Sequence, residues 1–134
     1  MDDIYDITII GGGPSGLYSA FYAGLRDLKT KIIEYKSTLG GKLHIYPEKI
    51  IWDIGGLPAT PAQQVMENLI EQGLTFNPTV CLNTKVDFVT KKGDIFVIET
   101  STGEKHFSKK VVVAVGGGII SPIKLHVEGA EKYE

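Results

Sequence analysis

Hydrophobic and polar positions at the start of the chain follow first a strand pattern and then a helix pattern. Tyr5–Ile10 is short, rich in β-branched residues and bounded by glycine, which predicts a buried parallel strand. Pro14–Arg26 carries apolar or small residues at helical spacing and predicts a helix, and Lys31–Tyr35 predicts a second strand. The residues expected on one face of that helix are Leu17, Ala20, Phe21 and Gly24. Together these elements predict a β-α-β unit.

The next stretch, Ser37–Leu57, fits neither period, so we expect a structured loop with a short extended piece at Ile50–Trp52. Trp52 lies next to isoleucines, and we expect it to pack in the core. A helix is predicted from Thr60 to Gly73, with Thr60 and Gln63 as a capping box and Pro61 at the first helical position.

The second half of the chain predicts strands almost throughout. Thr79–Leu82 and Lys110–Val115 are expected to be further parallel strands. Between them, turn sequences separate three short segments that predict an antiparallel β-meander: Lys85–Thr90, Asp94–Thr100 and Lys105–Ser108. The pattern therefore predicts an α/β fold, with a parallel sheet covered by helices and a three-stranded meander added to it.

Composition narrows the class of protein. The 134 residues suit one domain, and 43% hydrophobic with 22% charged residues is typical of a globular protein. A net charge of −2 gives no reason to expect a nucleic-acid partner. No apolar run approaches the about 18 residues that a membrane span needs. The acidic start, with Asp2, Asp3 and Asp6, is unlike a signal peptide, so we expect a cytoplasmic protein without a membrane anchor.

The residue types that bind metals or form disulfides are sparse. Cys81 is the single cysteine and lies between Val80 and Leu82, which favours a buried structural thiol. His44, His106 and His126 show no metal-ligand spacing, so we expect no metal site.

Candidate chemistry begins at the glycine cluster that joins the first strand to the first helix. Gly11-Gly12-Gly13-Pro14-Ser15-Gly16 matches G-x-G-x-x-G in the strand–turn–helix context that gives this pattern its meaning. The first glycine permits the tight turn, the second lets the backbone approach a pyrophosphate, and the third lets the helix pack on the strand. The helix N-terminus would face the phosphates, and Ser15 could add a hydroxyl donor.

A carboxylate completes this fingerprint. Glu34 follows the second strand, 23 residues after Gly11, where such motifs place a ribose-binding acid. The motif therefore predicts dinucleotide binding, and an acid at this position argues against a ribose 2′-phosphate. Spacing alone leaves NAD and FAD open.

Four longer stretches resemble a known family. "YDITIIGGGPSGLYSAFYAGLR", "KIIEYKSTLGGKLHIYPEK", "IIWDIGG" and "KVVVAVGGG" resemble the amino-terminal part of the thioredoxin-reductase-like flavoproteins, and most of all the bacterial ferredoxin/flavodoxin–NADP reductases of that fold. The resemblance implies a Rossmann-like fold that binds FAD. It also implies that residues 1–134 are the first segment of a discontinuous FAD-binding domain, without the NADPH domain and the final FAD segment.

The resemblance further implies which residues touch FAD. The pyrophosphate loop corresponds to Gly11, Gly13, Pro14, Ser15 and Gly16, and the ribose carboxylate to Glu34. The flavin and its ribityl chain would lie along Gly41, Lys42 and Leu43, with Tyr46 stacked on the ring and Asp53 near it. Adenine would lie at Val86, and the second flavin motif corresponds to Ala114, Val115, Gly116 and Ile120.

Two of these positions depart from the family pattern. Lys42 replaces the usual glutamine, and Ile120 stands where an aromatic residue is frequent. One hypothesis is that Lys42 raises the flavin potential. The alternatives are that it faces solvent or meets a phosphate.

The implied function is transfer of electrons from NADPH through FAD to ferredoxin or flavodoxin, by a homodimer. No catalytic acid, base or nucleophile is expected in this segment, and the 134 residues alone are expected to be inactive. Two alternatives stay open: a segment of a thioredoxin-reductase-type disulfide reductase, and a non-catalytic nucleotide-binding half-domain.

Overall fold

The computed structural model describes residues 3–119 of the chain. Its centre is a four-stranded parallel sheet in the order β10-β2-β3-β6. These strands span β2 Ile7–Ile10, β3 Thr30–Ile33, β6 Thr79–Cys81 and β10 Val111–Val113. All four predicted parallel strands are therefore present and all neighbouring pairs in this sheet are parallel, as expected.

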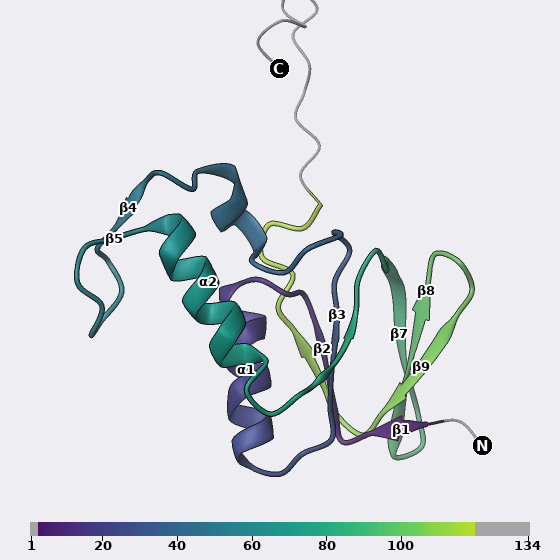
Figure 1. Cartoon of the computed structure of the whole chain (residues 1–134). Helices are drawn as coiled ribbons and strands as arrows, with labels where there is room; N and C mark the ends of the chain where they lie inside the picture. The colour runs from purple at the N-terminus through teal and green to yellow at the C-terminus, as the bar shows by residue number, and fades with distance from the viewer. Residues whose placement is uncertain (1–2, 120–134) are drawn as a thin grey trace, which may run out of the picture.

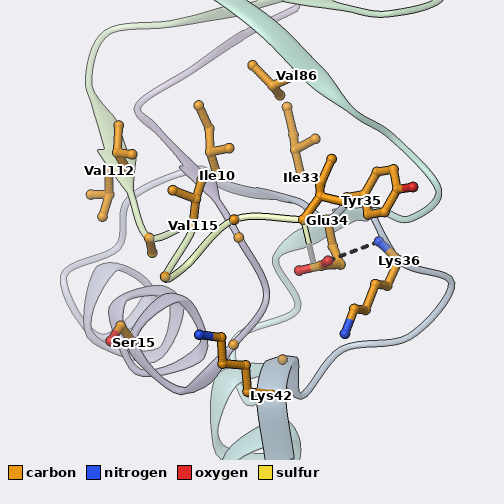
Figure 2. A pocket seen from close by; sticks show the side chains of 18 of the residues that line it. Ile10, Ser15, Ile33, Glu34, Tyr35, Lys36, Lys42, Val86, Val112 and Val115 are labelled. Carbon is orange, nitrogen blue, oxygen red and sulfur yellow. Dashed lines mark hydrogen bonds between the residues drawn. The ribbon is translucent and has the colours of Figure 1, made fainter. Parts of the chain in front are cut away.

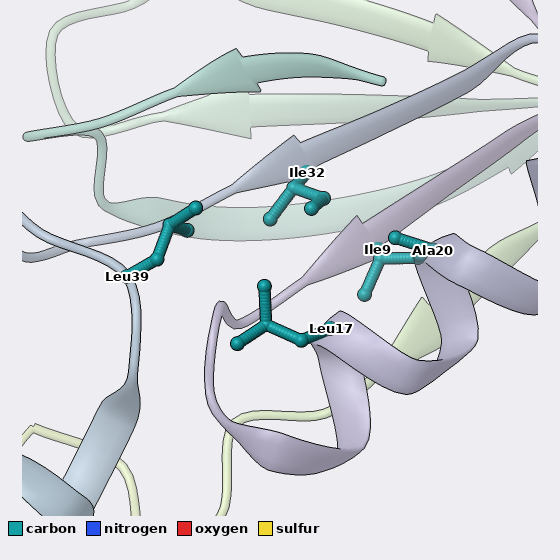
Figure 3. Close-up of a cluster of buried hydrophobic side chains, with 5 residues drawn as sticks. All are labelled: Ile9, Leu17, Ala20, Ile32 and Leu39. Atoms are coloured by element: carbon teal, nitrogen blue, oxygen red, sulfur yellow. The ribbon is translucent and has the colours of Figure 1, made fainter. Parts of the chain in front are cut away.

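Two helices cover one face of this sheet, α1 Pro14–Leu25 and α2 Ala62–Gly73 (Figure 1). Ile9 and Ile32 are paired neighbours in the sheet and point to the helices, where they pack with Leu17, Ala20 and Leu39 (Figure 3). The two helices also touch closely, since a side chain at Gly73 would collide with Leu17. This packing holds α1 against the strand that precedes it.

The other face carries the antiparallel meander, β7 Val86–Lys92, β8 Ile95–Thr100 and β9 Lys105–Ser108 (Figure 1). Ile10 and Ile33, one residue further along their strands, point to this side and pack with Ile98. Alternate residues of β2 and β3 thus supply two cores, as the two-residue period of a strand requires. The predicted meander is confirmed.

The first predicted strand is interrupted at Asp6. Residues Ile4–Tyr5 form β1, which pairs in parallel with β9 and adds a fourth strand to the meander sheet. The Asp6 carboxylate accepts hydrogen bonds from Lys29 N (2.9 Å) and Lys109 Nζ (2.8 Å). The prediction of one strand over Tyr5–Ile10 was therefore wrong, because Asp6 is held by residues from two other segments while the chain changes sheets.

The start of the second helix also differs from the prediction. α2 begins at Ala62, and Thr60–Pro61 form β5, an antiparallel pair with β4 Ile50–Ile51. Thr60 Oγ1 donates a 2.7 Å hydrogen bond to Pro58 O instead of capping the helix. The pairing of Ile51 with Thr60 keeps the expected cap residue in extended conformation. A five-residue 3-10 helix, η1 Gly41–Ile45, also lies within the segment that was predicted to be a loop.

Trp52 follows β4 and is 79% exposed, so the prediction that it packs in the core was wrong. The isoleucines around it form an apolar run that is typical of a buried strand, which is why the sequence favoured the core. The adjoining side chains Ile50 and Ile54 are exposed as well.

Candidate functional site

A pocket of about 810 Å³ opens at the carboxyl ends of β2, β3 and β10 (Figure 2). This volume is within the range of small-molecule sites. β2 connects through α1 to β3 on one side, whereas β10 pairs with it on the other side. Such a reversal of strand order is where open α/β sheets bind ligands.

The structure brings most of the predicted site residues together around this pocket. The lining includes Gly11, Gly13, Pro14, Ser15, Glu34, Gly41, Lys42, Val86, Ala114, Val115 and Gly116. They come from segments that are up to about a hundred residues apart in the sequence.

Two of the motif glycines are required by the fold itself. Gly11 has φ +113°, and a Cβ there would collide with the carbonyl of Ala114, the residue that directly follows β10. A Cβ on Gly16 would collide with the Gly11 carbonyl. Gly16 lies beneath the loop and does not line the pocket. These two glycines let α1 pack tightly against the strand ends.

Gly13 is different, because the protein leaves room for a side chain there. Its φ is −80°, and the nearest atom to a Cβ would be Gly41 Cα at an ordinary 3.6 Å. The absent side chain therefore leaves open space at the pocket wall, where a ligand can approach the backbone.

The amino-terminal turn of α1 faces this open space. Gly13 is the N-cap, no side chain caps the helix, and its first turn contains no acidic residue. The first N–H groups of a helix have no partner within the helix and carry partial positive charge. Ser15 adds a hydroxyl to the pocket wall. A phosphate group fits this combination of donors.

Glu34 is held directly after β3 by the backbone. Its Oε2 accepts a 2.6 Å hydrogen bond from Gly12 N and its Oε1 accepts a 2.9 Å hydrogen bond from Lys36 N. The side chain is 8% exposed yet lines the pocket. An ionised carboxylate has about four acceptor positions, so capacity remains for sugar hydroxyls.

The opposite wall is formed by the segment that leads into η1. Gly40 N donates a 2.8 Å hydrogen bond to Gly12 O, and a Cβ on Gly41 would lie 2.8 Å from Gly13 Cα. Lys42 follows directly and extends into the pocket (Figure 2). The two glycine segments are therefore in backbone contact.

Several predicted residues lie elsewhere. Leu43 is buried in a cluster with Val65 and Met66 of α2, and Tyr46 is half-buried at the edge of the same cluster. Asp53 is exposed, and Ile120 lies outside the described residues. In the described part of the chain, the pocket lining does not include Leu43, Tyr46 or Asp53.

Other lining residues carry no motif and were not predicted. They include Ile10, Ile33, Tyr35, Lys36, Thr84 and Lys85. The sequence analysis also did not predict that Gly12 binds Glu34. Gly12 is tightly packed, since a Cβ there would lie 2.5 Å from Leu39 Cδ2. Their place in the sequence could have predicted them, because most of these residues lie at or just beyond the end of a parallel strand.

Among residues 3–119, no metal site is formed by His44, His106 or Cys81, and His126 lies outside these residues. Cys81 ends β6 and is half-buried, and burial raises the pKa of its thiol. Such a thiol is a poor nucleophile at neutral pH. Within the same residues, no helix has the length and apolar character to cross a membrane.

The chain is similar to known proteins over nearly its whole length. A family model described as pyridine nucleotide-disulphide oxidoreductase matches residues 5–134. The chain is 60% identical to ferredoxin–NADP reductase 3 of Lysinibacillus sphaericus and 59% identical to ferredoxin–NADP reductase 2 of Exiguobacterium sibiricum. Each alignment covers the whole chain but 38% of the relative, so the chain spans little more than a third of these proteins.

Solved structures show the same fold. Thioredoxin reductase from Streptococcus pyogenes matches with a TM-score of 0.77 at 26% identity, over 99% of this chain and 41% of that one. A ferredoxin-flavin thioredoxin reductase from Clostridium acetobutylicum matches with a TM-score of 0.74 at 29% identity, over 92% of this chain and 42% of that one. The resemblance to thioredoxin-reductase-like flavoproteins, and among them to ferredoxin–NADP reductases, is confirmed, as is the fold class.

Proposed function

The chain belongs to the pyridine nucleotide-disulphide oxidoreductase family, and from that premise we propose that it supplies the FAD-binding part of a ferredoxin–NADP reductase. Because it spans 38% of the curated relatives, the reductase activity is proposed for a longer protein that includes this chain. Residues 1–134 are proposed to belong to its FAD-binding domain.

The open space at Gly13 carries the proposal. Gly11 and Gly16 are explained by packing, whereas Gly13 has no such explanation and borders the pocket in front of α1. We propose that the pyrophosphate of FAD lies there, with its adenosine ribose on Glu34 and its adenine toward Val86. The flavin would then extend toward Gly41 and the loop Ala114–Gly116.

FAD, when bound, accepts a hydride from a nicotinamide and releases electrons one at a time. The residues described here would bind and orient it. The backbone loop and α1 would receive the phosphates, Glu34 would fix the ribose, and the apolar strand ends Val112, Val113 and Val115 would exclude water from the pocket. NADPH is the proposed electron donor, bound outside these residues.

Ferredoxin is the proposed acceptor because the relatives of 57–60% identity carry the name ferredoxin–NADP reductase. Flavodoxin as a second acceptor, a homodimeric assembly and a cytoplasmic location are further proposals.

A disulfide reductase is the second candidate function, favoured by the structural match to thioredoxin reductase. Cys81 is the one cysteine among the described residues, and burial raises the pKa of its thiol. A redox-active cysteine pair would therefore need at least one cysteine from outside this chain.

The two functions can be distinguished by testing whether the full-length protein reduces ferredoxin or thioredoxin. With NADPH as donor and FAD loaded, we expect rapid reduction of ferredoxin and little reduction of thioredoxin. Reduction of thioredoxin but not of ferredoxin would favour the disulfide reductase. FAD binding without transfer to either protein would contradict both activities and favour a nucleotide-binding role.

A further inference from the structure

A buried lysine and a buried histidine join the parallel sheet to the meander. Lys31 of β3 and His106 of β9 are 8% and 6% exposed, and Lys31 Nζ lies 2.9 Å from His106 Nδ1. Among the described residues, no group accepts a hydrogen bond from the other ring nitrogen of His106, Nε2. Buried polar groups normally have partners, so this exception indicates a role other than packing.

This polar pair lies directly beside an apolar contact between the same two sheets. Lys31 and Ile33 are two residues apart on β3 and therefore share a face. His106 is paired with Ile98 in the β8–β9 ladder, and Ile98 packs against Ile33. The polar pair and the apolar contact are thus neighbouring parts of one interface.

Three members of this apolar contact also line the pocket at the strand ends: Ile10, Ile33 and Val86 (Figure 2). Val86 is the first residue of β7 and belongs to the meander, whereas Ile10 and Ile33 end two strands of the parallel sheet. The shape of this pocket wall therefore depends on how closely the meander lies against the parallel sheet.

The surroundings of the pair do not favour a second positive charge. Burial, and then the charge of Lys31, lower the pKa of His106. Glu104 Oε1 lies 3.6 Å from His106 Nε2, but the Glu104 side chain is 63% exposed, so water screens its charge. The other titratable groups near the pair surround Lys31, and they are Asp3, Tyr5, Lys29 and Cys81.

We propose that His106 is a positioning residue for the FAD pocket, and that its protonation weakens FAD binding by separating the meander from β3. This inference rests on the proposed FAD site. A protonated imidazole has no acceptor for the Lys31 ammonium, so the hydrogen bond is lost and two positive charges face each other. Separation at His106 also moves its ladder neighbour Ile98 away from the strand ends that line the pocket.

The test is the pH dependence of FAD affinity, measured by calorimetric titration of FAD into the FAD-free full-length protein. Between about pH 7.5 and about pH 5, we expect the affinity to fall about fivefold, which is a modest coupling between two sites. His106→Gln should show little of this change, because its amide oxygen still accepts the Lys31 hydrogen bond and does not titrate. Protonation of Glu34, within the pocket, would affect both proteins alike.

His44→Gln is the matched control. His44 is the other histidine among residues 3–119, is exposed and does not line the pocket. Its replacement should leave the pH dependence of FAD affinity as in the unmodified protein. Circular dichroism checks that each protein is folded at each pH.

The protonation of His106 can also be followed directly in the unmodified protein. By linkage, a fivefold effect of the proton on FAD affinity requires an equal effect of FAD on proton affinity. We therefore expect saturating FAD to lower the pH midpoint of the His106 imidazole NMR signal by about 0.7 pH unit. The loss of this signal in His106→Gln identifies it.

The possible outcomes separate this inference from the proposed function. FAD affinity that is constant with pH, or that changes equally in His106→Gln, would overturn the inference and leave the FAD site intact. A rise in affinity at acidic pH would also overturn it, because attraction between His106 and the phosphates would then exceed any effect of the pocket wall. Failure of the unmodified full-length protein to bind FAD at any of these pH values would contradict the FAD site, and the inference with it.

Discussion

Gly12 N donates a 2.6 Å hydrogen bond to Oε2 of Glu34, across 22 residues of sequence. The glycine loop and the ribose-binding position are thus parts of one hydrogen-bonded unit at the strand ends. Lys36 N binds the other carboxylate oxygen and completes it.

Replacing Glu34 with glutamine should disturb this unit. A neutral amide has one oxygen acceptor, so its NH2 group would face either Gly12 N–H or Lys36 N–H. Leaving one buried donor unpaired costs about 1–3 kcal/mol, and we expect the free energy of unfolding to fall by that amount. Affinity for FAD should fall about tenfold, since the amide also binds a ribose diol less well.

Urea unfolding and calorimetric titration measure the two effects of Glu34→Gln. Glu48→Gln is a matched control, since Glu48 is exposed and lies outside the pocket. Wild-type stability and affinity in Glu34→Gln would contradict the role assigned to the carboxylate.

Neighbouring glycines should respond differently to one added methyl group. In Gly12→Ala the methyl would meet Leu39 Cδ2 at 2.5 Å and Glu34 Oε2 at 3.0 Å, so we expect a loss of about 1–3 kcal/mol in stability. In Gly13→Ala the nearest atom is 3.6 Å away, and stability should stay within about 0.5 kcal/mol of the unmodified chain. Thermal or urea unfolding of the two variants gives the comparison, and equal losses would show that Gly13 is also a packing glycine.

Much of this site could be predicted from sequence because its signals are local. The strand before Gly11, the glycine spacing and Glu34 lie within one β-α-β unit, whose geometry allows few alternatives. Asp53 and Tyr46 depend instead on an irregular segment, and neither lines the pocket in the described chain. The sequence pattern also did not indicate that Lys31 is buried. In the structure Lys31 contacts His106 of β9, a residue 75 positions away in the chain, and no local pattern predicts such a distant partner.

Lys31 and His106 form a buried polar pair between the parallel sheet and the meander. Lys31 Nζ lies 2.9 Å from His106 Nδ1, with exposures of 8% and 6%. An ammonium group can only donate, so Nδ1 accepts and the imidazole is neutral with its proton on Nε2. Nε2 faces Glu104 Oε1 at 3.6 Å, and the Tyr5 ring lies 4.1 Å from Lys31 Nζ.

This pair should make stability depend on pH. Burial, and then the charge of Lys31, lower the pKa of His106 below 6.5. The unfolded chain therefore takes up the proton more readily, so the full stability is present above pH 6.5 and decreases as the pH falls below it. We expect urea unfolding to show lower stability at about pH 5.5 than at about pH 7.5.

His106→Gln provides the control, because glutamine can accept the Lys31 hydrogen bond and does not titrate. Its stability should be nearly constant over the same range. The ion pairs of Asp3 with Lys29 and of Asp6 with Lys109 lower the pKa of each carboxyl below 3.8, so they weaken only at more acidic pH. An equal pH dependence in His106→Gln would assign the effect to other groups.

Trp52 should contribute little to the stability of this chain. Its side chain is 79% exposed, so Trp52→Ala should change the free energy of unfolding by no more than about 0.5 kcal/mol. Leu17→Ala serves as the contrast, because that fully buried side chain should cost about 2–5 kcal/mol. A loss above about 2 kcal/mol in Trp52→Ala would place Trp52 in a core, as the sequence pattern predicted.

The central claim is that the pocket at the ends of β2, β3 and β10 binds FAD through the Gly13 backbone. The most direct measurement is a titration of FAD into the full-length protein and into its Gly13→Val variant, with folding of both followed by circular dichroism. We predict that the unmodified protein binds FAD and that Gly13→Val keeps the fold but loses binding, because its side chain fills the space for the pyrophosphate. Absence of binding by the unmodified full-length protein, or equal affinity in Gly13→Val, would contradict the claim.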